Sequence, residues 1–474
     1  MFKQFDDKLN LLSHFFMLLL MAASIYYSQE RMLHSDNANL TFWLINTKDY
    51  STAHGRFPVY LTQFLMIWGV KLKLSVKSLI MLYSFNFYLL YYFAFLVAAF
   101  FYKNATIAYL IVLSLLIMTH DIFFLQTEVM HGIVFGLLFA AYLLHQPATK
   151  GIMLTSHLLG ITAFVMAVFF HQISCIFLVI VTGWYLVYSR EFTSYKTYAY
   201  LLAALGILWY KMTGTSAGSY EDYYYSNAPG IIDTLKHFRN SGVFLFYSRY
   251  SESIYLLPNI LLALSLLWLI LKRSYMQAAY IAAAYAGYFI LISSMFVLDS
   301  QIMMERIYLP LGAMICLAIA FVLKDVSFST GGTRSAFALS TLFIILCIGM
   351  SNIIMAAPKY TRRLNQVKMQ AEKLQAQQGH RFYTYTKDVD KTNEFPFWAA
   401  SCEQILYSAV HYPGNIKTMY LFDDSLQVRK ALVDEPLHGN EFLYAPFALK
   451  CDTSFLNPDY FKIKHDQYQY INFN

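Results

Sequence analysis

The sequence predicts an α-helical polytopic membrane protein that ends in a small soluble α/β unit. Hydrophobic residues make up 58% of the 474 residues and charged residues only 13%, whereas soluble domains carry about 25% charge. The charge is also uneven, because 27 of the last 117 residues are charged but only 36 of the first 357. We therefore expect a membrane-embedded domain over residues 1–357 and a non-cytoplasmic soluble α/β domain over residues 358–474.

Apolar runs of sufficient length predict about eleven transmembrane helices. A span needs about 20 apolar residues, and about 17 can suffice. The first run, residues 11–27, follows Lys3 and Lys8 and is typical of an uncleaved signal anchor with a cytoplasmic N-terminus. The other runs lie at residues 77–101, 105–119, 130–145, 152–170, 173–189, 197–212, 253–271, 275–298, 307–323 and 336–357.

Lysine and arginine occupy every short gap that this topology places in the cytoplasm, as the positive-inside rule requires. This placement accounts for the net charge of +7, which in a soluble protein might indicate a nucleic-acid partner, so we expect no such partner. The opposite side receives residues 28–76, residues 213–252 and the tail, and we expect it to be the periplasm of a bacterial inner membrane, with the endoplasmic reticulum lumen as the eukaryotic equivalent. Both compartments are oxidising, so Cys402 and Cys451 of the tail could form a disulfide.

The first outer loop holds the most informative residues. Asp36 follows the first span, and apolar residues at helical spacing over Leu40–Leu44 predict an amphipathic helix on the membrane surface. His54 and Arg56 precede Pro58, which can open a second surface helix. Asp36 is thus expected at the depth of lipid headgroups, although an ordinary solvated loop aspartate is the alternative.

Two further outer segments carry ionisable side chains. Asp121, Glu128 and His131 lie between and at the start of consecutive spans, and Glu305 and Arg306 open the tenth span. Arg306 opposes the positive-inside bias, and a guanidinium donates two hydrogen bonds at once to phosphate. No span has Asp or Glu at its centre, which argues against an ion-coupled transporter. The alternatives are headgroup anchors and an interfacial Arg306–Glu305 pair.

These segments together resemble the GT-C superfamily of membrane glycosyltransferases, which includes the protein O-mannosyltransferases and the aminoarabinose transferase of lipid A. Asp36 resembles the acidic residue of the family's first outer loop, and residues 56–61 resemble a degenerate basic-Pro-Pro-Leu-Tyr element with one proline. Residues 127–130 resemble the polar element that opens the fourth span. Residues 305–310 resemble Glu-Arg-Tyr-x-x-Pro, with Ile before Tyr.

The resemblance implies a polyprenyl-phosphate-linked sugar donor and a glycan, lipid or protein acceptor on the outer side. It implies Asp36 as general base and Glu128 as a second catalytic residue, with either Glu128 or His131 orienting the acceptor or a metal. Arg306 and Arg56 would hold the donor phosphate. A divalent cation is compatible with such sites, although no metal-ligand spacing is present. Further candidates for substrate contacts are His54, Asp121, His131, Tyr223 and Glu305.

We expect the tail and the second outer loop to have supporting roles. Residues 381–385 and 416–422 predict strands, and residues 397–410 predict a helix. Tyr223 belongs to a tyrosine cluster that suits either glycan stacking or membrane anchoring.

Two other functions stay open from the sequence. A polysaccharide polymerase or O-antigen-type ligase would depend on basic residues of the outer loops, such as Arg239 and Arg249. A lipid-oligosaccharide flippase would transport without transfer.

Overall fold

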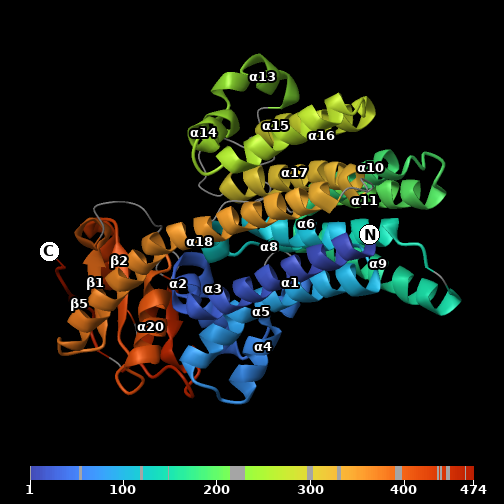
Figure 1. Ribbon diagram of the computed structural model, residues 1–474. Helices are drawn as coiled ribbons and strands as arrows, with labels where there is room; N and C mark the ends of the chain where they lie inside the picture. Colours follow the sequence, from blue (N-terminus) through green and yellow to red (C-terminus); the bar gives the residue numbers. More distant parts are fainter. Residues whose placement is uncertain are drawn as a thin grey trace.

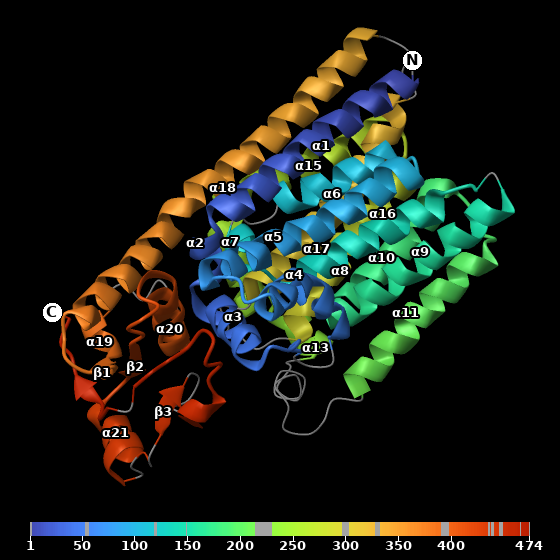
Figure 2. The same cartoon turned by 90° about the horizontal axis from the view of Figure 1, so that it is seen from below.

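Each of the eleven predicted apolar runs contains a helix in the computed structural model of the chain (Figure 1). The structure describes residues 2–52, 56–117, 121–147, 149–213, 230–295, 303–327, 332–389, 398–434, 437, 440–444, 449–464 and 466–473. The helices pack lengthwise into a bundle, and a smaller α/β tail lies at one end (Figures 1 and 2). The N-terminus lies at the opposite end of the bundle from the tail (Figure 1).

Seven helices of the described chain are long and apolar enough to cross a membrane, or eight if one bent pair counts as a single span. The bent pair is α14 (Gly242–Ser251) and α15 (Leu256–Leu271), which meet at 93°. The seven are α1 (Phe2–Tyr26), α5 (Val76–Leu96) with its extension η2 (Val97–Phe101), α9 (Lys150–Phe170), α10 (Gln172–Ser189), α16 (Tyr275–Met295), α17 (Met303–Ser327) and α18 (Gly332–Gln375).

Three helices in the predicted apolar runs are not among the candidates for membrane spans. The helix α6 (Ala105–Ile117) has 13 residues, or about 20 Å of rise, against a hydrocarbon core of about 30 Å. The helix α8 (Glu128–Leu144) has 17 residues. Nearly every residue of both is buried by neighbouring helices. The helix α11 (Tyr195–Thr213) carries Lys196 and Lys211 and is not among the seven. Eleven spans therefore remain a prediction.

The longest helix connects the bundle to the tail. The 44 residues of α18 correspond to about 66 Å, and the helix runs through Pro358 without a break. It contacts α1 and α6 in the bundle and α20 (Ala400–His411) in the tail. A single helix thus belongs to both predicted domains, as Figure 2 shows.

The tail contains the predicted strands and helix. Strand β1 (Arg381–Tyr385) pairs in parallel with β2 (Thr418–Phe422) and with β5 (Gln469–Tyr470), and α20 packs against β2. A hairpin of β3 (Glu441–Tyr444) and β4 (Leu449–Asp452) lies beside this sheet. The short elements are α19 (Thr386–Val389), α21 (Ser425–Val428), η4 (Arg429–Asp434) and η5 (Thr453–Phe455).

The first outer loop forms the two predicted helices, but the first of them has a different partner from the one expected. After α2 (Ser28–Met32) comes α3 (Ser35–Thr47), whose Phe42 is fully buried against the rings of Tyr444 and Phe461 in the tail. Trp43 lies against Phe455, with ring centroids 5.4 Å apart. The apolar residues of α3 therefore pack on the tail, and the expectation that this helix lies on the membrane surface is corrected.

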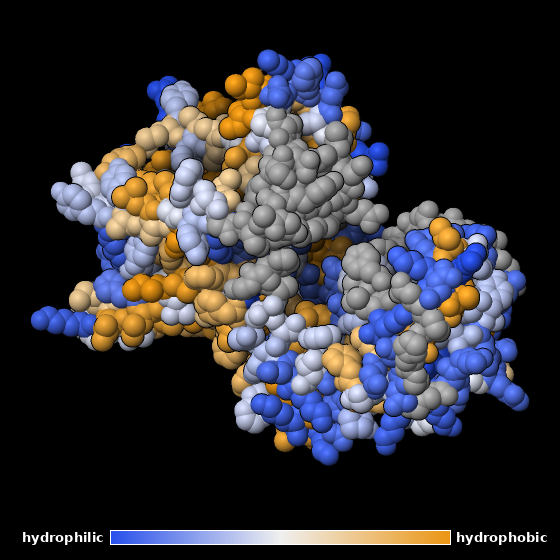
Figure 3. Space-filling view, turned by 180° about the vertical axis from the view of Figure 1, so that it is seen from behind, coloured by the Kyte–Doolittle hydropathy of each residue, from blue (hydrophilic) through white to orange (hydrophobic). Residues whose placement is uncertain are grey.

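The second helix, α4 (Tyr60–Lys71), follows the short turn η1 (Phe57–Val59) and exposes apolar side chains. Tyr60, Phe64 and Trp68 are exposed at helical spacing, while Thr62 and Gln63 are buried. This inverted pattern is the one expected of a helix that faces lipid. The surface of the helical body exposes many further apolar residues, whereas the tail surface is largely hydrophilic (Figure 3).

The two tail cysteines are both free thiols. Cys402 lies on α20 and Cys451 on β4. The disulfide that the sequence suggested is thus not formed, and Cys402 instead lies beside Tyr444, whose hydroxyl donates to Asn39 of α3 over 2.7 Å.

Replacing Phe42 by alanine should loosen the tail from α3. Removal of a fully buried phenylalanine costs about 3–5 kcal/mol, so the Phe42→Ala variant should unfold at a clearly lower temperature in detergent. Phe64→Ala is the matched control, because Phe64 is 47% exposed and its loss should cost under about 0.5 kcal/mol. Equal melting temperatures of the two variants would show that the tail does not depend on this contact.

Candidate functional site

Three carboxylates lie in the first turns of three helices. Asp36 lies in the first turn of α3, Glu128 in that of α8 and Glu305 in that of α17. A helix N-terminus favours negative charge, because its unpaired N–H groups and its dipole point outward. Glu128 interacts electrostatically with both Asp36 and Glu305. The three predicted outer segments therefore converge on one site.

Asp36 is held by contacts from both parts of the chain. Ser35 and Trp398 give its carboxylate side-chain hydrogen bonds, and Trp398 belongs to the tail. Asp36 is nevertheless an exposed residue. It therefore lies where the bundle meets the tail, at a solvent-accessible place that we call the recess.

The recess shifts the protonation of Asp36. Desolvation by the surrounding protein raises the pKa of this carboxyl above its ordinary value of 3.8, and the negative charge of Glu128 raises it further. The hydrogen bonds from Ser35 and Trp398 act in the opposite direction and are weaker. A carboxylate with a raised pKa is a stronger base than a solvated one, so Asp36 is suited to accept a proton.

Glu128 is paired with Arg56, which lies just before η1. Their side chains approach to 3.3 Å and are 34% and 19% exposed, respectively. Thr127 caps α8, because its hydroxyl accepts from the backbone N–H of Val129 at 3.2 Å. Lys211, near the end of α11, lies within electrostatic reach of Arg56. The carboxylates are thus accompanied by cations on one side of the recess.

Glu305 and Arg306 open α17 beside this pair. Thr127 gives Glu305 a side-chain hydrogen bond, and Arg56 and Arg306 both interact with its charge. The Arg306 side chain is only 8% exposed, and the Tyr288 hydroxyl donates to its backbone carbonyl. Arg56, Glu128, Glu305 and Arg306 therefore form one alternating cluster of charge.

Asp121 and His131 are used elsewhere. Asp121, on α7 (Asp121–Leu125), accepts from the Tyr360 hydroxyl at 3.0 Å and lies 3.7 Å from Lys359, so it anchors α18. The ring of His131 is buried inside the bundle, 3.1 Å from the carbonyl of Thr127. The structure therefore does not bring these two predicted substrate contacts to the recess.

Two other predicted contacts, His54 and Tyr223, lie outside the described residues. Among the residues that the structure does describe, no three His, Cys, Asp or Glu side chains gather as a metal ion would need. The described residues of the recess therefore do not fit a protein-built cation cage.

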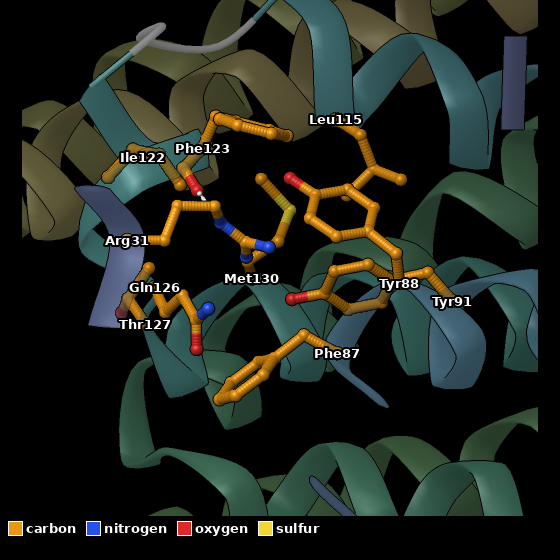
Figure 4. A pocket seen from close by; sticks show the side chains of 10 residues that line it. All are labelled: Arg31, Phe87, Tyr88, Tyr91, Leu115, Ile122, Phe123, Gln126, Thr127 and Met130. Atoms are coloured by element: carbon orange, nitrogen blue, oxygen red, sulfur yellow. Dashed lines mark hydrogen bonds between the residues drawn. The ribbon is translucent and has the colours of Figure 1, made fainter. Parts of the chain in front are cut away.

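Arg31 of α2 is a buried cation that the sequence analysis passed over. Its Nε donates to the carbonyl of Phe123 at 2.8 Å, and its Nη1 donates to the hydroxyl of Ser84 at 2.6 Å. The guanidinium points into a small cavity with the phenol groups of Tyr88 and Tyr91 (Figure 4). Burial lowers the pKa of Arg31 to about 10, which still leaves it charged at neutral pH. Arg31 therefore joins α2, α5 and α7 behind the recess.

Sequence signals for the overlooked residues differ in strength. Arg31 follows the first span on the outer side, where the positive-inside rule disfavours a cation, so it could have been noticed. Trp398 has no such signal, because it reaches Asp36 from more than 360 residues away.

Comparison of the chain with known protein families, curated proteins and solved structures finds no match.

Replacing Asp36 by asparagine should stabilise the fold at neutral pH. Because the pKa of Asp36 is raised, the folded chain binds this proton more tightly than the unfolded chain, and its stability falls as pH rises through the raised value. Thermal unfolding should therefore favour the Asp36→Asn variant at pH 7, with a difference that shrinks toward pH 4. Asp49→Asn should change little, because Asp49 is exposed and lies just beyond the end of α3. No gain for Asp36→Asn at pH 7 would contradict the raised pKa.

Proposed function

We propose that the chain is a membrane glycosyltransferase of the GT-C type, which moves a sugar from a polyprenyl-phosphate donor to an acceptor hydroxyl on the outer face of the membrane. One observation carries the proposal. An exposed carboxylate with a raised pKa lies beside a cluster that includes two arginines, at the end of the bundle next to the tail. A base and a phosphate site side by side are the two groups that such a transfer requires.

In the proposed reaction, Asp36 accepts the proton of the acceptor hydroxyl. The acceptor oxygen forms a bond to the anomeric carbon, while the bond from that carbon to the donor phosphate oxygen breaks and inverts the configuration. Arg306 and Arg56 stabilise the charge that grows on the departing polyprenyl phosphate. Glu305 and Glu128 hold these guanidinium groups in place.

The apolar helices support a membrane location for this reaction. The N-terminus and the tail lie at opposite ends of the bundle, which agrees with the proposed cytoplasmic N-terminus and outward tail. We propose the bacterial inner membrane, with the recess at the outer headgroup level. The exposed apolar face of α4 would lie against lipid there.

Asp36→Asn should abolish transfer without unfolding the chain. Loss of a general base costs about 10²–10⁴-fold in rate, so kcat measured with a polyprenyl-phosphate sugar donor should fall at least 100-fold. Arg306→Gln should also reduce transfer, after thermal unfolding confirms that the variant is folded. Arg249→Ala is the control, because Arg249 is exposed on α14. Full activity of Asp36→Asn and Arg306→Gln would refute the mechanism, and loss only in Arg249→Ala would favour a polymerase or ligase.

The acid limb of the pH profile should report Asp36. Because the base must be deprotonated, kcat/KM should fall as pH drops through a pKa above the ordinary 3.8 of an aspartate. Glu128→Gln removes a neighbouring negative charge that raises this pKa, so the acid limb should move to lower pH even if the rate falls. A limb that stays in place would show that the titrating group is not Asp36.

A further inference from the structure

We propose that Glu403, on α20 of the tail, is the positioning residue that fixes Asp36 in the recess. The inference rests on the proposed function, because it takes Asp36 as the general base. Glu403 does not touch the recess itself. It acts through Ser35, the residue directly before Asp36 in the chain.

The contact between Glu403 and Ser35 replaces a missing helix cap. The residue before α3, His34, makes no side-chain capping hydrogen bond. Instead the backbone N–H of Ser35 donates to Oε1 of Glu403 over 2.8 Å. This N–H is one of the donors that a helix start cannot satisfy within itself. The tail therefore provides the N-terminal partner of the helix that carries Asp36.

Ser35 also needs to be held in place. Its φ of +46° lies in the left-handed region, which is disfavoured for a non-glycine residue. Such a conformation persists only where surrounding contacts impose it. Because Asp36 follows Ser35 directly, a change of the Ser35 backbone would redirect the first turn of α3 and move the carboxylate.

The other oxygen of Glu403 is fixed from the bundle side. Oε2 pairs with Nη2 of Arg363 on α18, and the two side chains are 1% and 2% exposed, respectively. Buried ion pairs contribute little net stability compared with apolar residues, although they can define one specific arrangement. Here the pair orients Glu403 so that its second oxygen meets Ser35. α18, Glu403 and the start of α3 thus form one continuous chain of contacts.

The experiment compares two double variants that both remove the buried ion pair. Arg363→Met with Glu403→Gln keeps an amide oxygen for the Ser35 N–H, whereas Arg363→Met with Glu403→Met removes this acceptor. The matched control is Gln370→Met with Gln404→Met, which removes another buried hydrogen bond of 2.7 Å between α18 and α20. Each full-length protein is measured by hydrogen exchange over residues 33–40 and by steady-state transfer kinetics.

We expect the loss of the acceptor at position 403 to act specifically on the start of α3, so Arg363→Met with Glu403→Met should exchange over residues 33–40 at least about tenfold faster. Its kcat should fall at least about tenfold with KM changed less than about twofold, because a displaced base lowers the rate rather than binding. Arg363→Met with Glu403→Gln should retain most of both properties. The glutamine control should lose thermal stability only.

Three outcomes would overturn the inference: an unchanged kcat in the variant with Glu403→Met, equal losses in both double variants, or the same losses in the glutamine control. If the parent chain transfers no sugar, the proposed function fails. The exchange comparison then still decides whether Glu403 holds the start of α3, because it needs no substrate.

Discussion

The packing of α3 against the tail is the constraint on which the rest of the site depends. This helix lies between the bundle and the tail (Figure 2) and carries Asp36 at its start. In the middle of the helix, the Phe42 side chain is buried against aromatic rings of the tail. Near its end, Nδ2 of Asn46 donates to the carbonyl of Phe455 at 2.8 Å. Lys48 adds an exposed ion pair to Asp459 at 3.2 Å. The position of Asp36 is therefore determined by the tail as much as by the bundle.

The structure shows where some of the few charged residues of the helical body lie. Only about a tenth of its residues are charged, yet Asp36, Glu128 and Glu305 all lie where helices begin. Helix N-termini offset part of the cost of placing carboxylates next to an apolar bundle. Arg56 and Arg306 offset a further part. Such a site keeps ionised groups close together without burying any of them unpaired.

Local sequence patterns predicted the elements of the fold, but not the contacts between distant ones. Apolar runs and alternating residues located the helices and the tail strands, because these signals depend on neighbours in the chain. The sequence predicted that Asp36, Glu128 and Arg306 would converge, because the three outer segments that carry them were assigned to the same side of the membrane. Glu403 could not be predicted, since it meets Ser35 across 368 residues and nothing near it distinguishes it from a surface glutamate. For the same reason α3 was assigned to the lipid surface instead of the tail.

The surroundings of Glu403, Glu128 and Asp36 differ, and these differences decide which of the three carboxylates can accept a proton from an incoming group. Both oxygens of Glu403 are occupied in a dry interior, by Ser35 and by Arg363. Glu128 is engaged by Arg56 at 3.3 Å. Asp36 alone among these three is exposed while its pKa is raised by desolvation, so it combines solvent access with the capacity to accept a proton. A tail that supplies Trp398 to this carboxylate, and Glu403 to the preceding residue Ser35, is consequently part of the site, and its removal would take the proposed base out of position.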